Sequence, residues 1–306
     1  MDLALAIDIG GTKLAAGLVT EEGEVVRSAT APTPTASDAE AVFDVVRGLL
    51  DAVRAPGRSG PTERIGGPSG PTERSDGPVV VCGVGCGGPM TGGGEAVSAL
   101  NIRAWRDFPL RARLGLSTGL PTFVDNDAKA LALGEGWKGA AADERDFIAM
   151  VVSTGIGGGI VLDGRLLDGA DGNAGHVGHV IVEPDGRLCA CGARGCLEAE
   201  ASGPSIAAAT GRPAIEAGPE VVARTGRLVG RAVASVANLL DLSLAVVAGS
   251  VALGFGAPFF VAAQEELDAR ARLDFSRGAR IVPAGLGADG PLVGAAAVGW
   301  RGAGRL

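Results

Sequence analysis

The chain has no tyrosine, only two histidines, and no excess of positive charge: its 306 residues carry a formal net charge of -8. An acidic chain is poorly suited to nonspecific binding of nucleic acid or of an anionic membrane surface. Apolar runs of membrane-spanning length are also missing, and Met1-Asp2 leads into an apolar segment without a basic start. These absences predict a cytoplasmic protein. The 51 glycines and the lack of tyrosine are as typical of a coding bias as of any structural demand.

Cysteine is scarce as well, and its distribution is uneven. Of the five cysteines, three lie between Gly172 and Gly203, and both histidines fall in the same stretch. An odd number in this arrangement fits a reducing compartment better than a disulfide framework. His179, Cys189, Cys191 and Cys196 form an H-x9-C-x-C-x4-C pattern.

One imidazole and three thiolates are a complete tetrahedral ligand set for structural zinc. The alternative, unrelated surface residues, must explain why most of the soft ligands gather in one glycine-containing segment. A fourfold protein ligand set leaves no open position for a substrate or an activated water. The predicted zinc therefore stabilises a loop, and the chemistry is expected elsewhere.

Buried strands alternate with amphipathic helices along the chain, which predicts an α/β protein whose sheets are covered on both faces. A chain of this length favours two domains. The segment 55–78 repeats GPTER and is rich in breakers, which indicates a surface insertion without function. Strands are expected at 3–9, 14–20, 79–84, 121–124, 147–152, 160–162, 244–248 and 281–283, and helices at 36–54, 128–137, 219–240 and 258–271.

Two turns built of small residues directly follow buried strands. The first runs from Asp8 through Gly10, Gly11, Thr12 and Lys13, and the second spans 153–159. Such turns let backbone N–H groups approach a phosphate. Neither has the spacing of a Walker or Rossmann motif, and either one alone would more often be a plain hairpin turn. Together with the side-chain-poor loop 85–89, they favour a phosphoryl site and suggest duplicated halves facing one another across a cleft.

Asp127 lies where a strand ends and a helix begins, next to Asp125 and Asn126. A single Asp in this place is often only a helix N-cap. The functional interpretation is a general base that takes a proton from a substrate hydroxyl during phosphoryl transfer. Asp8, at the tip of the first strand, would then hold the water shell of Mg²⁺ near the terminal phosphate.

These motifs occur in the order and spacing of the ROK family, which contains sugar kinases and sugar-responsive repressors. The resemblance covers nearly the whole chain, from Asp8 to the segment 286–289, and the zinc loop is its most specific part. It implies a two-domain, actin-like fold resembling hexokinase (ribonuclease H-like), with sugar and ATP in the interdomain cleft. We expect a small domain of residues 1–118 and 291–306, a large domain of 119–290, and a homodimer or homotetramer. The implied cofactors are ATP, Mg²⁺ and structural Zn²⁺.

The resemblance also implies roles for individual residues. Asp127 matches the base that activates the sugar 6-hydroxyl, and Asn126 matches a ligand of the 3- and 4-hydroxyls. Glu198 matches an acid near the anomeric end of the sugar, and His179 matches a residue that binds zinc through one nitrogen and faces the sugar with the other. The remaining implied contacts are Gly88, Asn101 and His176 to the sugar, and Asp8, Gly10, Gly11, Thr12, Lys13, Thr154, Gly155 and Gly249 to nucleotide and metal.

Two departures from the family pattern bear on the substrate. His176 stands where the family usually has a glutamate, and Gly87 stands where it usually has a proline. A neutral imidazole offers one donor and one acceptor where a carboxylate offers several lone pairs. Glucose is the leading substrate, and mannose, kanosamine or glucosamine, and N-acetylated hexosamines remain open.

Two other functions are conceivable for a chain with these motifs. A DNA-binding repressor of this family carries a helix-turn-helix ahead of the motif that here starts at Asp8, which argues against that function. A sugar binder without catalysis is disfavoured by the intact Asp127 and Thr154.

Overall fold

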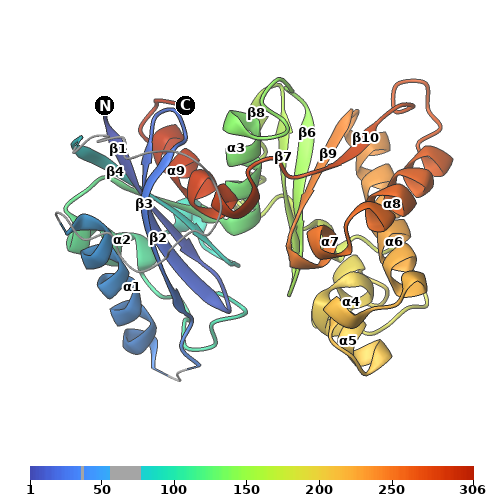
Figure 1. The fold of residues 1–306 in the computed structure, drawn as a ribbon, viewed down its shortest axis with the longest axis horizontal. Helices are drawn as coiled ribbons and strands as arrows, with labels where there is room; N and C mark the ends of the chain where they lie inside the picture. Colours follow the sequence, from blue (N-terminus) through green and yellow to red (C-terminus); the bar gives the residue numbers. More distant parts are fainter. Residues whose placement is uncertain (36–37, 56–76) are drawn as a thin grey trace, which may run out of the picture. The chain divides into compact units, whose positions relative to one another are not determined.

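The computed structural model describes residues 1–35, 38–55 and 77–306, and the fold is α/β as predicted (Figure 1). The chain forms two compact units. Unit 1 consists of Met1–Trp137 and Ala288–Leu306, and unit 2 of Lys138–Gly287. The repeated GPTER segment lies within 56–76, outside the described residues.

The division differs from the expected boundary between residues 118 and 119. Residues 122–126 form a strand that pairs in parallel with the strand over 79–86, so they belong to the sheet of unit 1. The helix over 127–138 contacts the C-terminal helix over 290–302: Gly294 of the latter lies against the backbone carbonyl of Ala130. Strand pairing and helix packing thus retain residues up to Trp137 in unit 1.

Unit 1 is built on a five-stranded sheet in the order β3-β2-β1-β4-β5. β1 pairs antiparallel with β2 and parallel with β4. On the outer sides, β2 pairs antiparallel with β3, and β4 pairs parallel with β5. The strands are β1 (Leu3–Ile9), β2 (Lys13–Thr20), β3 (Val25–Pro32), β4 (Val79–Cys86) and β5 (Thr122–Asn126).

Alternating residues of β1 enter two separate cores, as the period of a strand requires. Leu3, Leu5 and Ile7 pack with helices α1 (Ala39–Arg54) and α2 (Leu110–Thr118), whereas Ala4 and Ala6 pack with α9 (Gly290–Gly302). Small alanines on the α9 side let the helix lie close to the sheet. The remaining elements that belong wholly or mostly to unit 1 are η1 (Gly92–Gly94), α3 (Asp127–Lys138) and η4 (Gly287–Asp289).

Unit 2 repeats this topology. Its sheet has the order β10-β9-β6-β7-β8, in which β6 pairs antiparallel with β7 and parallel with β9. Read from the antiparallel edge, the two sheets therefore have the same strand order and the same senses. The strands are β6 (Phe147–Val152), β7 (Ile156–Leu162), β8 (Arg165–Leu166), β9 (Leu244–Ala248) and β10 (Arg280–Pro283).

Two long helices, α6 (Pro219–Leu240) and α8 (Ala257–Arg270), pack closely together over the unit 2 core. Gly226 and Gly230 face the backbone of α8, so a side chain at either position would collide with it. The other elements are η2 (Val177–His179), α4 (Leu197–Ala201), α5 (Gly203–Thr210), η3 (Ala214–Glu216) and α7 (Ser250–Phe255).

One expectation about local structure was wrong. The turn predicted over 153–159 is confined to its first residues, because β7 begins at Ile156 and Gly157 to Gly159 lie in the strand. Gly158 sits against the carbonyls of Ala149 and Gly175, where a larger side chain would be crowded. Within the described ranges, no helix has the combined length and hydropathy needed to cross a bilayer.

Candidate active site and metal centre

The predicted site residues fall into two groups, one in each unit. In unit 1, the parallel strands β1, β4 and β5 end at the same edge of the sheet, with Asp8 opposite Gly85 and Gly85 opposite Asp125. A Cβ at Gly85 would lie 3.7 Å from the Cα of Asp127 and 3.8 Å from Oδ1 of Asp8. The sheet therefore brings the two carboxylates that were predicted as base and magnesium ligand to one place.

The first small-residue turn connects β1 to β2 and faces solvent. The Gly10 N–H donates to the Lys13 carbonyl at 3.1 Å, which closes the turn. Thr33 donates from its hydroxyl to the Gly10 carbonyl at 2.7 Å and supports the turn from the end of β3. Gly11 lies directly against the Asn101 side chain, so any larger residue at Gly11 would displace it. Asn101 is thus placed beside the turn that was expected to hold phosphate.

Asp127 begins α3, and its two carboxylate oxygens face different groups. Oδ1 accepts from the Ala128 N–H at 2.9 Å, and Oδ1 of Asn126 accepts from the same N–H at 3.0 Å. A Cβ at Gly87 would lie 4.0 Å from Oδ2 of Asp127, and one at Gly88 would lie 3.5 Å from the Asn126 amide nitrogen. Asp127 is thus the first residue of α3 rather than its N-cap, and the acceptor two residues before the Ala128 N–H is Asn126. The bond to Ala128 holds Oδ1 of Asp127, and Oδ2 faces the glycine-rich loop 85–89.

Neighbouring Asp125 has a different task. Its Oδ1 lies 3.1 Å from Nζ of the buried Lys129, and its Oδ2 lies 3.7 Å from Nη1 of Arg301 on α9. These ion pairs anchor the end of β5 to α3 and α9. Of the two aspartates in the motif, the structure assigns Asp125 to anchoring and leaves Asp127 at the loop.

Burial at the strand end raises the pKa of Asp8 to about 7, the negative charge of Asp127 adds to this effect, and Lys13 opposes it. An aspartate with this pKa is partly protonated near neutrality when no cation is present. A divalent cation nearby would favour its charged form.

In unit 2, the second small-residue turn lies at the end of β6, next to the end of the parallel strand β9. Oγ of Ser153 and Oγ of Ser250 are 2.9 Å apart and join the two strand ends. Gly249 has φ +101°, and a side chain there would collide with the backbone of Val152. Thr154 is exposed at the tip of the turn, as a phosphate contact requires.

Glu198 contacts this turn. Its Oε2 accepts from the Ile156 N–H at 2.8 Å and lies close enough to Gly155 that a Cβ there would be 3.0 Å away. The predicted sugar ligand Glu198 and the predicted phosphate ligand Gly155 are therefore neighbours within unit 2. The hydrogen bond orients the carboxylate of Glu198 at the start of α4.

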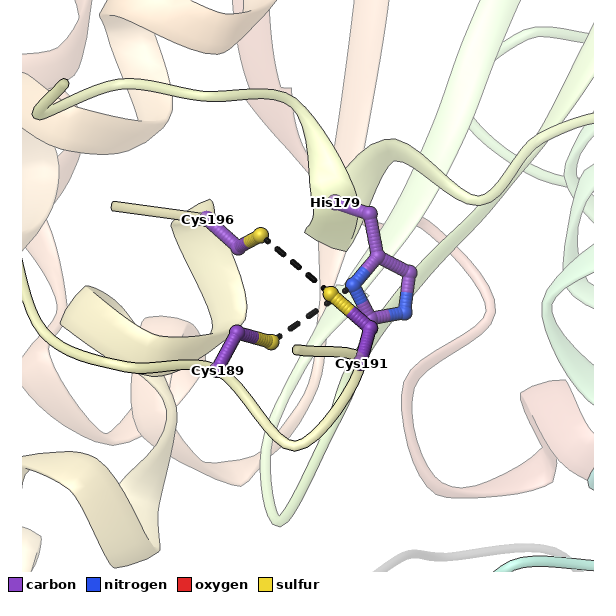
Figure 2. Close-up of side chains that lie close together, drawn as sticks. All are labelled: His179, Cys189, Cys191 and Cys196. Carbon is purple, nitrogen blue, oxygen red and sulfur yellow. Dashed lines mark hydrogen bonds between the residues drawn. The ribbon is translucent and has the colours of Figure 1, made fainter. Parts of the chain in front are cut away.

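The four predicted metal ligands converge on one point (Figure 2). Their ligand atoms all lie within 4.8 Å of one another. Sγ of Cys191 and Sγ of Cys196 are 3.7 Å apart, and Sγ of Cys189 is 3.7 Å from Nδ1 of His179. Zinc–sulfur bonds of about 2.3 Å in a tetrahedron place the sulfurs about 3.8 Å apart. These residues therefore fit a tetrahedral zinc ion.

Loop geometry explains how the thiols meet. Gly192 and Gly195 have φ +92° and +71°, which permits the tight turn between Cys191 and Cys196. Burial and the neighbouring thiols raise the pKa of Cys196 to about 12, whereas a backbone hydrogen bond at Ala193 helps to lower the pKa of Cys191. Metal binding must displace the Cys196 proton, because the thiolate is the ligand.

His179 uses Nδ1 toward the thiols, which leaves Nε2 on the other side of its ring (Figure 2). The exposed His176 is its neighbour, with ring centroids 6.0 Å apart and planes tilted by 33°. His176 directly precedes the short η2 turn and His179 ends it, and the His179 N–H donates to the His176 carbonyl at 3.0 Å. The two imidazole rings are therefore neighbours at the start of the zinc loop.

Sequence reasoning missed two residues that shape this half of the site. Ser250 is joined to Ser153 but has no distinctive motif beyond following Gly249. Glu200 is buried, with 2% of its side chain exposed, and is paired with Arg224. In the sequence Glu200 is only one more acidic residue after Cys196. Its burial and its pairing with Arg224 become visible only in the fold.

Comparison with known proteins agrees with this geometry. The model of the ROK family matches residues 70–300. N-acetylmannosamine kinase of Citrobacter koseri is 35% identical over an alignment of 267 residues that covers 82% of this chain and 84% of that protein. A ROK hexokinase structure from Thermus thermophilus has a TM-score of 0.81 and 30% identity and covers 99% of both chains. A ROK glucokinase from Streptomyces griseus, solved with glucose and AMPPNP, has a TM-score of 0.79 and 30% identity over 98% of this chain and 99% of that one.

The fold and these comparisons define a sugar kinase with an actin-like ATPase fold. The chain belongs to the ROK family.

Proposed function

We propose that the protein is an ATP-dependent kinase that phosphorylates the 6-hydroxyl of a hexose, with glucose as the first candidate. The observation that carries the proposal is Asp127, whose Oδ1 is held by the Ala128 N–H while its Oδ2 faces Gly87 in the glycine-rich loop 85–89. A carboxylate fixed in this way is suited to accept a proton from a bound hydroxyl. ATP as donor is supported by the Streptomyces griseus glucokinase complex with AMPPNP.

In this mechanism Asn126 binds sugar hydroxyls and Asp127 accepts the proton of the 6-hydroxyl. The hydroxyl oxygen forms a bond to the γ-phosphorus, the bond from that phosphorus to the bridging oxygen breaks, and ADP leaves. Backbone N–H groups at Gly11, Thr12 and Gly155 provide donors for the phosphates. Mg²⁺, when bound with the nucleotide, neutralises phosphate charge, and Asp8 would hold its water shell.

Zinc is proposed as the ion of the His179–Cys189–Cys191–Cys196 group. All four positions of the tetrahedron are taken by protein, so its role is structural. His179 would hold the ion through Nδ1, which would fix the orientation of its ring and leave Nε2 as the proposed sugar contact. Glu198, held by Ile156, provides the second sugar contact of unit 2. The homodimer or homotetramer expected from the family remains a prediction.

N-acetylmannosamine is the second candidate substrate, and two observations favour it. N-acetylmannosamine kinases are 35% identical to this chain over most of its length. His176 also stands where the family usually has a glutamate, and it lies next to His179. An imidazole can donate a hydrogen bond to an acetamido carbonyl, which a carboxylate cannot do.

The deciding experiment is an ADP-release assay with ATP and Mg²⁺ on glucose, mannose, glucosamine, kanosamine and N-acetylmannosamine. The His176→Glu variant is assayed in parallel. The highest kcat/KM on glucose would support the first candidate, and turnover confined to N-acetylmannosamine, weakened by His176→Glu, would support the second. Sugar binding without any turnover across the panel would contradict the kinase proposal and favour a sugar-binding protein without catalysis.

A further inference from the structure

The zinc loop, residues 179–196, is attached to helix α6 at two points. Arg224 and Arg231 are seven residues apart, which is two helical turns, so both side chains project from the same face of α6. Arg231 donates from Nη1 to the Val182 carbonyl at 2.8 Å and to Glu183 at 2.6 Å. This first attachment holds the part of the loop that directly follows His179.

Glu200 makes the second attachment. One carboxylate oxygen accepts from the Arg187 N–H at 2.6 Å, and the other accepts from Nη2 of Arg224 at 2.7 Å. Arg224 also donates from Nη1 to the Glu200 backbone carbonyl at 3.2 Å. The single carboxylate of Glu200 therefore ties the loop segment just before Cys189 to helix α6.

Glu200 also sits on the element that carries two site residues. It lies on α4, which follows directly after Cys196 and contains Glu198. Movement of α4 would therefore displace a predicted metal ligand and a predicted sugar ligand together. The position is tightly enclosed, since Gly186 lies so close to Glu200 that a Cβ there would overlap the carboxylate.

Stability alone does not explain a buried carboxylate here. Removing charges from water offsets much of what a buried ion pair contributes, so a well-packed apolar side chain is often as stable. What an apolar residue cannot do is fix the Arg187 N–H and the Arg224 guanidinium in one geometry. The arrangement is suited to orientation rather than to net stabilisation.

We propose that Glu200 is a positioning residue for hexose binding, holding the zinc loop and α4 in register on Arg224. The inference rests on the proposed function, because it assumes that His179 and Glu198 contact the sugar. Glu200 itself does not touch the substrate. It acts through the orientation of the two residues that do.

The test compares Glu200→Gln, Glu200→Leu and Arg224→Met with the wild-type protein. Glu200→Leu and Arg224→Met are expected to raise the hexose KM about tenfold or more, the range seen when residues that orient ligands are lost. The kcat and the KM for ATP should stay within about twofold. Glu200→Gln keeps an acceptor for the Arg187 N–H, so its hexose KM should stay closer to the wild-type value than that of Glu200→Leu.

A second readout is independent of activity. Zinc released into a colorimetric chelator should appear several-fold faster from Glu200→Leu and Arg224→Met than from wild type. Arg227→Met is the matched control, because Arg227 is an exposed arginine one turn further along α6. It should change neither the hexose KM nor zinc release.

Lower thermal stability with an unchanged hexose KM and unchanged zinc release would overturn the inference, since Glu200 would then be only structural. If Glu200→Leu does not fold, Arg224→Met and Glu200→Gln decide the question by the same two readouts. A wild-type protein that phosphorylates no hexose would instead overturn the proposed function and the sugar part of the inference. Zinc release would still decide whether Glu200 holds the loop.

Discussion

At the scale of single residues, Asp127 is the most informative position. Its Oδ1 is used by the Ala128 N–H, and an asparagine can keep that hydrogen bond through its own carbonyl oxygen. Asp127→Asn should therefore leave the start of α3 intact while removing the proton acceptor. We expect kcat to fall by about 10²–10⁴-fold, the usual contribution of a general base.

Hexose affinity is the control for that variant. Isothermal titration should give a dissociation constant within a few-fold of the wild-type value, because Asn126, His179 and Glu198 remain. A variant with near wild-type kcat would show that another group accepts the proton. Loss of both kcat and sugar binding would show that the substitution disturbed the site as a whole.

Asp8 provides a pH-dependent prediction at the same scale. Its pKa is raised from 3.8 to about 7 in the folded protein, so folding favours the protonated form. The stabilisation is complete below about pH 4 and is lost as the pH rises through about 7. Asp8→Asn removes the charge, so it should stabilise the protein most at pH 8 and by less than half as much at pH 5, where the aspartate of the unfolded chain is already ionised.

A shift of this size corresponds to up to about 4 kcal/mol at pH 8. Thermal melts at pH 5 and pH 8, in buffer without Mg²⁺ and without chelator, measure the difference. We expect the Tm of Asp8→Asn to exceed that of wild type by several degrees at pH 8 and by a clearly smaller amount at pH 5. An equal gain at both pH values would show that the charge of Asp8 is not the cause.

At the scale of elements, the zinc loop makes the clearest prediction. Elemental analysis of protein purified without chelators should find one zinc per chain. Cys196→Ser should lose the ion, because Cys196 is buried and contributes one corner of the tetrahedron. The hexose KM should rise and the Tm should fall, since His179 and the loop lose a shared anchor.

Cys82→Ala is the matched control for that experiment. Cys82 is a buried cysteine on β4 of unit 1 and is not among the clustered ligands. It should retain the full zinc content, although the smaller side chain should cost some stability. Equal zinc loss from both variants would place the ion elsewhere.

The elements themselves show what the sequence could predict. Long strands and helices with a clear period, such as β1, α1 and α6, lie where hydrophobic patterning placed them. Short elements, such as α4 and α5, were missed because a helix of a few residues has no measurable period. The glycines at 157–159 suggested a turn, but they form a strand because other backbone segments approach them closely.

The candidate site divides in the same way. The clustering of the four metal ligands and the position of Asp127 between a strand and a helix were predictable, because both follow from local spacing that the sequence displays. The partners that orient them were not, because Arg224, Arg231 and Ser250 come from distant segments that only folding brings near. Asp125 and Asp127 also look alike in sequence, and only the Lys129 and Arg301 ion pairs distinguish the anchor from the loop carboxylate.

At the scale of the whole molecule, the first and the last residues of the chain both belong to unit 1. The N-terminal strand β1 and the C-terminal helix α9 belong to the same unit although they stand at opposite ends of the sequence. Leu292 and Trp300 of α9 pack on the Ala4 and Ala6 face of the sheet. Unit 1 therefore cannot complete its core until the last residues of the chain are in place.

A chain truncated after Gly287 should consequently fail to form a stable unit 1. Burial of Leu292 and Trp300 alone contributes about 5 kcal/mol, which is comparable to the net stability of a typical domain. We expect insoluble protein, or soluble protein that has lost the thermal transition of unit 1 and all kinase activity. Truncation after Gly302 is the control, because it keeps α9 and removes only the contacts of the last four residues. These are the Arg305 ion pairs to Asp2 and Glu21, the Arg305 guanidinium over the Trp300 ring, and backbone hydrogen bonds at the end of α9. Exposed ion pairs contribute little, so this shorter truncation should melt within a few degrees of the full chain. Equal damage from both truncations would show that the contacts of the last four residues, rather than α9, are what unit 1 needs.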